Sequence, residues 1–453
     1  MITQEAALSA IRFGYGLHPD QRPPSGPDAL MAALASPPAR DRAAPPVEER
    51  LASVRRLIMG RRMRNRDEAG GEAMLNQGSE ELRALGVGDV QRLFGRAIGG
   101  ENAFYERLSL FWADHFTVEW LNRRISVIAA DLIETAIRPH LTGRFPDMLK
   151  AVARHPSMLR YLDHDEVAGP NSPVAQENRR AGMNENLARE ILELHTLGVD
   201  GNYSQTDVRQ FAELLTGFHF TEDGFIYEPG RAEPGAETVL GVSYGGQKGR
   251  ARDVDAALED LGMNPITARH LASKLITHFL GPIEGQAQVV ERMARAYLQA
   301  DGALMPMYAA LLEAPGAFEL PLLKAKTPFD FVVTASRSFG ATRADVEARS
   351  MQNIRRDFME PMAKMGMPLM QAGGPDGWPE APETWITPPG LAARIEWAHK
   401  LTQNLGRGIE PATFLETTLG PIAGPLLRRA VPGAETKVEG ITLVLASPEF
   451  NRR

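Results

Sequence analysis

The sequence predicts a mainly α-helical protein. Apolar residues recur at three- and four-residue spacing through most of the chain, which is the pattern of amphipathic helices. Prolines divide this pattern into short elements and long proline-rich loops. Only residues 218–228 (FHFTEDGFIYE) alternate aromatic and β-branched side chains around a turn at 222–224. We therefore expect one large helical unit with one small β-hairpin near 218–228.

The elements follow from this pattern in chain order. Helices are expected at 27–36, 47–63, 101–116, 125–141, 145–163, 184–198, within 200–218, and at 254–262, 266–280 and 286–300. The polar, glycine-containing segment 64–80 is a candidate mobile loop, and 218–246 is a hairpin insertion. The proline-rich stretch 366–390 is long enough to cover a surface or line a site. We assign the whole range 1–453 to a single domain.

Composition and charge restrict the function classes. With 43% hydrophobic and 24% charged residues, the 453-residue chain is typical of a globular protein. The net charge of -7 and the lack of a basic–aromatic stripe argue against nucleic-acid binding. The chain has no cysteine, which excludes disulfides, thiolate nucleophiles and cysteine-ligated metals. A metal would need His, Asp, Glu, Asn or backbone ligands.

The N-terminus and the hydropathy pattern bear on localisation. Residues 1–16 have no basic region followed by an apolar one, so we expect no signal peptide. No run of about 18 uncharged apolar residues is present, so we expect no transmembrane helix. The expectation is a soluble, cytoplasmic protein.

Residues 184–198 (NENLAREILELHTLG) carry an unusual number of charges for an apolar helix. At ~100° per residue, Asn186, Glu190 and Glu193 share one stripe, next to an apolar stripe that begins at Leu187. Carboxylates beside a buried face are paired or functional, because burying them unpaired is costly. Arg189 lies four residues from Glu193, at the spacing of a helical ion pair.

Two interpretations of this segment stay open. In the structural one, Arg189 forms i,i+4 ion pairs with both Glu185 and Glu193, which explains three of the four charges. Glu190 is left without a local partner. In the functional one, Glu190 is a general base whose pKa rises toward neutral, and Arg189 binds an anionic substrate group or holds Glu193 in place.

A second helix can complete a functional site. Residues 111–116 (FWADHF) place His115 at a helix end, beside Asp114. His115, Glu190 and Glu193 together would be a workable nitrogen and oxygen ligand set for a divalent metal. His115 is then either a metal ligand or the catalytic acid.

Two further groups contain candidate site residues. His270, Lys274 and His278 recur every four residues on one side of a helix, which is typical of a solvated face or of a face that lies along an acidic surface. Trp378 and Trp385, in the proline-rich stretch, either fill a core or form the wall of a pocket. Together with Asn186, the two tryptophans are the candidate substrate-binding residues.

Several motifs together resemble one bacterial family, the domain-of-unknown-function family numbered eighteen hundred. The matching stretches are RFGYG, FWADHF, YLD, GPNSP, NENLAREILELHTLGVDGNYSQTDV, EPGAETVLG, KTPFDFV, PDGWPE and LASPEF, from residue 12 to near the end of the chain. The resemblance implies one predominantly helical unit and gives weight to His115 and the polar residues of 184–193. Ala113 departs from the family pattern, because some members have a second histidine there.

The resemblance implies no reaction, so two functions are expected. One is an enzyme, metal-dependent through His115, Glu190 and Glu193. The other is a non-catalytic binding or assembly protein, with the hairpin and the proline-rich loops as its contact surface. Members are often encoded beside a phosphatase-superfamily-like protein with a twin-arginine export signal. That neighbour is the expected partner, and export together with it is the alternative to a cytoplasmic location.

Overall fold

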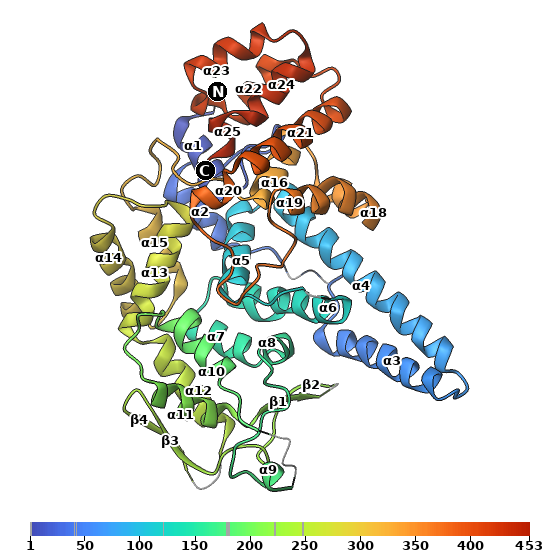
Figure 1. The fold of residues 1–453 in the computed structure, drawn as a ribbon. Coiled ribbons are helices and arrows are strands. Elements are labelled where there is room, and N and C mark those ends of the chain that lie inside the picture. The colour runs from blue at the N-terminus through green and yellow to red at the C-terminus, as the bar shows by residue number, and fades with distance from the viewer. Residues whose placement is uncertain are drawn as a thin grey trace.

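The protein is mainly helical, as the sequence predicts, with two small antiparallel hairpins (Figure 1). The computed structural model describes residues 2–39, 41, 43–120, 122–177, 182–221, 223–246 and 249–453. Within these ranges the side chains of Arg123 and Ile125 are not described. The predicted turn residue Glu222, and residues 178–181 of the polar insert before the NENLARE helix, lie outside the described residues.

The helices and strands have the following bounds. Helices of the first half are α1 (Gln4–Leu8), α2 (Gly26–Leu34), α3 (Val47–Asn65), α4 (Gly71–Gly99), α5 (Ala103–His115), α6 (Arg123–Leu132), α7 (Phe145–Ala153), α8 (Pro156–Tyr161), α9 (Pro173–Glu177), α10 (Asn186–Glu190) and α11 (Gln205–Leu215). The strands are β1 (Phe218–Thr221), β2 (Gly224–Tyr227), β3 (Gly235–Val239) and β4 (Val242–Gly246). Helices of the second half are α12 (Ala251–Gly262), α13 (Pro265–Phe279), α14 (Gln286–Gln299), α15 (Leu304–Leu312), α16 (Pro328–Ser338), α17 (Arg343–Glu347), α18 (Met351–Ile354), α19 (Glu360–Lys364), α20 (Pro382–Trp385), α21 (Pro388–Leu405), α22 (Pro411–Thr418), α23 (Pro425–Ala430), α24 (Lys437–Ala446) and α25 (Pro448–Asn451). Segments of π-helix lie at Ser9–Phe13, Ile133–Ile137, Ile191–Thr196 and Arg355–Met359, and 3₁₀ segments at Arg138–His140, Gly420–Ile422 and Val431–Gly433.

The molecule is elongated in Figure 1. Helices α21 to α25 form one end, where both chain termini lie, and the two hairpins form the other end. The antiparallel pair α3–α4 projects from the side of the body (Figure 1). The central helices α5 and α13 therefore lie between the two ends, where segments distant in sequence meet.

The prediction of a loop over 64–80 is wrong for most of that segment. Helix α3 continues to Asn65, a turn follows, and α4 begins at Gly71. Gly71 and Gly78 within this segment, and Gly60 before it, are contact points of the two closely packed helices. A Cβ at Gly60 would lie 2.3 Å from the Leu75 backbone nitrogen, and one at Gly78 would lie 2.5 Å from that of Leu57. Only glycine permits backbones to approach this closely.

Replacing Gly60 with alanine should therefore loosen the α3–α4 pair, although alanine favours a helix more than glycine does. The added methyl group meets backbone atoms that cannot rotate away, so we expect a loss of about 1–3 kcal/mol of stability. Hydrogen exchange of the α3 and α4 amides measures this effect. Gly433→Ala is the control, because its Cβ would meet nothing within 4 Å. Unchanged exchange in Gly60→Ala would contradict the close contact.

The predicted hairpin at 218–228 is present, and a second one follows it. In the first, Phe218 pairs with Tyr227 and Thr221 with Gly224. In the second, β3 and β4 are joined by Leu240 and Gly241, which both have positive φ. The prediction of a single hairpin missed this pair, because a leucine rarely occupies a position with positive φ.

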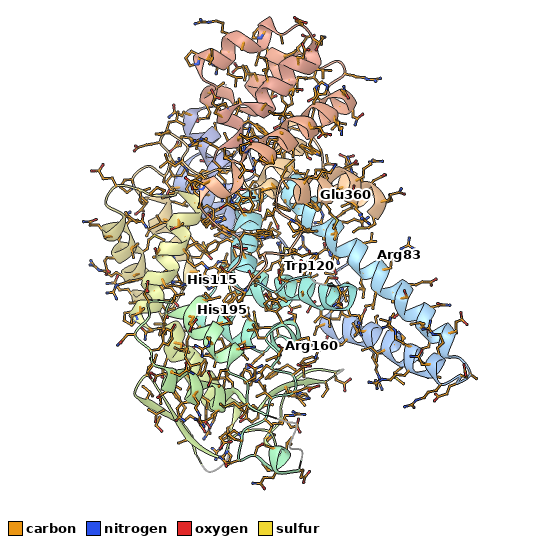
Figure 2. The ribbon with its side chains drawn as sticks, viewed as in Figure 1. Arg83, His115, Trp120, Arg160, His195 and Glu360 are labelled. Carbon is orange, nitrogen blue, oxygen red and sulfur yellow. The ribbon has the colours of Figure 1, made fainter. Side chains whose placement is uncertain are left out.

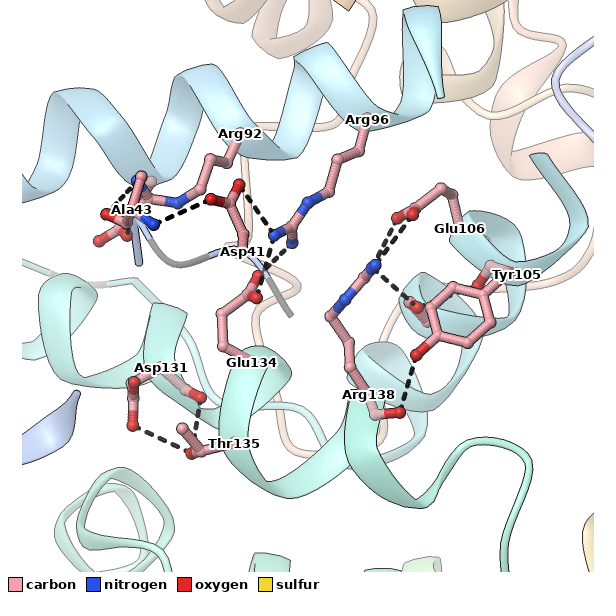
Figure 3. Close-up of polar contacts among 12 residues, drawn as sticks. Asp41, Ala43, Arg92, Arg96, Tyr105, Glu106, Asp131, Glu134, Thr135 and Arg138 are labelled. Carbon is pink, nitrogen blue, oxygen red and sulfur yellow. Dashed lines mark hydrogen bonds and ion pairs between the residues drawn. The ribbon is translucent and has the colours of Figure 1, made fainter. Parts of the chain in front are cut away.

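Helix α5 is held in the core by buried ion pairs as well as by apolar contacts. Its side chains Phe104, Leu108 and Trp112 are buried in the largest apolar cluster. Figure 3 shows the polar contacts on its other side. Arg138 donates two hydrogen bonds to Glu106, at 2.6 and 3.0 Å. Such bidentate pairs fix geometry, so the first turn of α5, which contains Glu106, is held rigidly against the segment that follows α6.

Candidate functional site

The charged helix at 186–196 contains the two ion pairs that the structural interpretation requires. Arg189 lies 3.0 Å from Glu185 and 3.2 Å from Glu193. Glu190 has no ion pair or hydrogen bond to any described residue. Burial and the nearby Glu193 raise its pKa, against the opposing charge of Arg189. The side chain of Asn186 is exposed on the same helix.

His115 lies in the middle of the molecule beside His195 (Figure 2). Its Nε2 is 3.2 Å from the His195 carbonyl oxygen, and its Nδ1 is buried without a partner. The ring centroid of His115 is 5.9 Å from that of His195 and 6.3 Å from that of His270. Burial, together with Lys274 and these histidines, lowers the pKa of His115 well below its ordinary value. His115 is therefore a buried, neutral side chain.

The predicted metal ligands are not assembled into a metal-binding group. Among the described residues, no three or more His, Asp or Glu side chains are placed to hold a metal ion. His115 faces aromatic rings and a carbonyl oxygen, and Glu193 faces Arg189. The donor set His115, Glu190 and Glu193 therefore does not fit a divalent metal in this arrangement.

The face of α13 that contains two histidines and a lysine lies along acidic residues, so the solvated-face interpretation is wrong. His270 Nε2 is 3.2 Å from the Leu194 carbonyl oxygen, and His278 Nδ1 is 2.6 Å from Glu380 Oε1. Lys274 has no hydrogen bond or ion pair with any described residue. Burial lowers its pKa, while Asp114, Glu380 and Asp376 act in the opposite direction.

The proline-rich loop packs onto the C-terminal end of α5. The Trp378 amide donates a hydrogen bond of 3.0 Å to Asp114 Oδ1. Gly377 has φ +82°, and a Cβ there would lie 2.8 Å from the Asp114 carbonyl oxygen, so glycine is required. Trp385 is buried behind the loop, where its Nε1 donates to the Pro379 carbonyl oxygen at 2.9 Å. The loop is thus anchored at both tryptophans, whose ring centroids are 5.8 Å apart.

A cavity of about 100 Å³ opens beneath this loop. Trp378 lines it, as the pocket-wall interpretation predicts, whereas Trp385 does not. Its apolar walls include Ala113, Leu110, Val118, Phe329, Met362, Met367, Leu369 and Met370. Its polar wall consists of Asp114, Thr117, His278, Glu380, Asp330 and Arg107, with Thr327 and Tyr15 nearby. Small apolar cavities with a few convergent polar groups are typical of binding sites.

Asp114 is the unusual group in this cavity. It is partly buried and has no ion pair to any described residue. Burial raises its pKa to about 7, although the Trp378 amide and Lys274 oppose the rise. Glu380 differs, because His278, Arg453 and Lys324 outweigh its burial and lower its pKa. Near neutral pH, Asp114 is therefore present in both its protonated and its ionised form, whereas Glu380 stays ionised.

Sequence reasoning missed Asp114, Lys274 and Glu380 as a group. In the sequence, Asp114 stands out only as the neighbour of His115 at a helix end. The three residues come from α5, α13 and the proline-rich loop, and only the fold brings them together. The sequence feature that could have pointed to this group is the pair of motifs FWADHF and PDGWPE. In the structure, the Trp378 amide of the second motif donates a hydrogen bond to Asp114 of the first.

Comparison with known proteins identifies the family. A family model described as Protein of unknown function (DUF1800) matches residues 9–452. The chain belongs to this family. No curated protein and no solved structure matches the chain. The DUF1800 description names no reaction. None of the helices in the described part is long and apolar enough to cross a membrane.

Proposed function

We propose that this DUF1800 protein is an enzyme in which Asp114 takes a proton from a small, largely apolar substrate. The observation that supports this proposal best is the carboxyl group itself. It lines an apolar cavity, has no countercharge within ion-pair distance in the described structure, and has a pKa raised to about 7 by burial. A carboxylate with a near-neutral pKa is an effective general base.

The neighbouring residues have distinct proposed roles. Lys274 opposes the rise in the pKa of Asp114 and thereby increases the fraction of ionised carboxylate at neutral pH. Because Lys274 is not among the cavity-lining residues, it acts through Asp114 and is a positioning residue. Glu380 and His278, 2.6 Å apart, offer the substrate a fixed polar wall. Trp378 and the methionines exclude water from the reacting proton.

The earlier candidate, Glu190, is retained as a second proposed proton acceptor. Its raised pKa and its lack of a partner support the role. Glu190 is also coupled electrostatically to the cavity through Asp376. This carboxylate raises the pKa of Glu190, of Tyr161 and of Asp114. Arg189 is occupied by Glu185 and Glu193, which supports a structural role for it. We propose no metal-dependent step, because the donor set does not fit.

Substrate depletion tests the proposal. The purified protein is incubated with a small-molecule extract of cells that encode it, and depletion is followed by mass spectrometry. We expect Asp114→Asn, which can still accept the Trp378 amide, to lower the rate by about 10²–10⁴-fold. Glu190→Gln, in contrast, should leave it within about threefold of wild type if Asp114 is the base. Asp200→Asn, on the exposed surface, is the matched control.

The pH profile of the same reaction separates chemistry from folding. A base must be ionised, so the rate should rise with pH through a midpoint near 7. Lys274→Gln should move that midpoint to higher pH, because the ammonium lowers the pKa of Asp114. Undiminished depletion by a folded Asp114→Asn protein would exclude Asp114 as the base. A large loss in Glu190→Gln alone would assign the role to Glu190.

A second proposal, a binding or assembly protein, is supported by the projecting α3–α4 pair (Figure 1). Arg61, Arg62 and Arg64 are exposed near its tip and form no hydrogen bond or ion pair with a side chain of the described structure. Such a surface fits an acidic partner. Co-purification with the neighbouring phosphatase-superfamily-like protein tests this. It should be lost in Arg61→Glu/Arg62→Glu and kept in the exposed control Arg429→Glu; retention in both would contradict it.

A further inference from the structure

A second cavity, separate from the one at Asp114, lies between the N-terminal loop, the start of α5 and the end of α16. It has a volume of about 490 Å³ and shares no lining residue with the Asp114 cavity. Its charged and titratable lining residues are His18, Arg22, Glu101 and Arg337. The uncharged walls include the polar residues Ser9, Gln21 and Asn102 and apolar residues such as Pro23, Pro24, Leu17 and Leu30.

Arg337 is a buried cation without a countercharge. Its residue is 4% exposed. Its Nη1 donates to the Ile98 carbonyl oxygen and its Nη2 to Gln21 Oε1 at 2.9 Å, but its Nε has no partner. No carboxylate of the described residues lies within ion-pair distance of it. Burial lowers the pKa of Arg337 to about 10, so the guanidinium is still charged at neutral pH. Buried charges are normally paired, because an unpaired one is costly.

The N-terminus of α5, a helix of 13 residues, opens onto the same cavity. The Asn102 side chain caps the Tyr105 amide at 3.1 Å, and the Glu106 amide bonds the Asn102 carbonyl oxygen. Ala103 and Phe104 line the cavity, and neither backbone amide donates a hydrogen bond to a described residue. Free amides and the helix dipole favour an anion at this position.

Arg22 adds a second cation at the cavity. It is exposed and has no hydrogen bond or ion pair in the described part of the chain. His18 cannot add a charge readily, because burial and Arg337 lower its pKa. Glu101 is the one acidic residue that lines the cavity, and it is exposed. The lining therefore carries an excess of positive charge in a protein whose net charge is -7.

We propose that this cavity binds the anionic group, a phosphate or a carboxylate, of a small organic molecule. Arg337 supplies the buried charge, the Ala103 and Phe104 amides supply directed donors, and Arg22 closes over the anion from the surface. A guanidinium and helix amides can bind both anions. The carboxylate has two coplanar oxygen acceptors and the phosphate has tetrahedrally arranged ones, and both accept hydrogen bonds from N–H groups. The apolar lining accommodates the uncharged part of the ligand.

Calorimetric titration with inorganic phosphate and with acetate, at low ionic strength and pH 7, tests the site. We expect saturable binding by the wild-type protein, and the tighter of the two probes identifies the class of anion. Arg337→Lys keeps the charge but loses the planar fork, so binding should weaken by about tenfold. Arg22→Ala should weaken it by about threefold, and Glu101→Gln should strengthen it by about threefold. Exposed Arg429→Ala is the control and should bind as wild type.

The surface variants keep the test decisive if Arg337→Lys fails to fold. Arg22 and Glu101 are exposed, so their replacement leaves the core intact. Opposite changes in affinity in Arg22→Ala and Glu101→Gln support the site. Absence of saturable binding of either probe by the folded wild-type protein overturns it. Equal affinities in wild type, Arg22→Ala and Glu101→Gln overturn it as well.

Discussion

Replacing Asp330 with alanine should destabilise the protein by about 3–5 kcal/mol, because it leaves two arginines buried without their shared partner. Asp330 lies 3.1 Å from Arg107 Nη2 and 2.9 Å from Arg453 Nε. Although burial acts in the opposite direction, Arg107, Arg453 and His278 lower the pKa of Asp330 to about 2. The carboxylate therefore joins α5, α16 and the last residue of the chain. Denaturant unfolding measures the loss.

The control for this substitution removes an exposed ion pair. Glu396→Ala breaks the 2.5 Å contact with Lys400. The side chain of Glu396 is 62% exposed and that of Lys400 is 64% exposed. Exposed pairs contribute little, so its effect should stay below about 1 kcal/mol. Equal, small losses in both variants would show that Arg107 and Arg453 find other partners or water. Because Asp330 also lines the Asp114 cavity, its loss should reduce the proposed activity too.

Acidification should destabilise the protein strongly between about pH 6.5 and pH 4. Burial, together with Lys274, lowers the pKa of His195 to about 3 and that of His270 to about 4. The unfolded chain takes up protons on these histidines below about pH 6.5, and the folded chain does so only near pH 3–4. Stability is therefore complete above pH 6.5 and falls as the pH drops. His195 alone accounts for a loss on the order of 4 kcal/mol.

Urea unfolding between pH 4 and pH 8 measures this dependence. His195→Gln should reduce the slope of stability against pH by about one proton in the acid range. His399→Gln is the control, because His399 hydrogen-bonds Gln403 on the surface. A slope that is the same in His195→Gln and wild type would mean that the buried ring is protonated in the folded protein.

The sequence was a good guide where the structure depends on local interactions. Helical spacing predicted many of the helices, and at the start of α11 the Asp207 amide donates a capping hydrogen bond of 3.2 Å to Ser204 Oγ. The ion pairs of Arg189 were predictable because both partners lie on the same helix. The two-residue turn at Leu240 was not, because leucine gives no turn signal.

The candidate site depended on distant segments, so less of it was predictable. Asp114 and Trp378 are 264 residues apart in sequence and hydrogen-bonded in the structure. The spacing places Glu190 and Glu193 on one stripe but says nothing about the direction of His115, so it could not show whether the three side chains come together. That ring points into an aromatic core beside His195. Trp378 and Trp385 were equivalent in sequence, and only packing separates the residue that lines the cavity from the one behind it.

The Trp378 amide donates a hydrogen bond to Asp114, so the position of the loop that covers the cavity depends on whether this one carboxyl group is ionised. An ionised carboxylate accepts a stronger hydrogen bond than a neutral carboxyl group does. If Asp114 is the proposed base, the loop is held most firmly while the carboxylate is ionised and less firmly once it is protonated. Protonation of this one carboxyl group would then be enough to loosen the loop, and its deprotonation enough to tighten the loop again. Neither a separate hinge nor a second ligand would be needed.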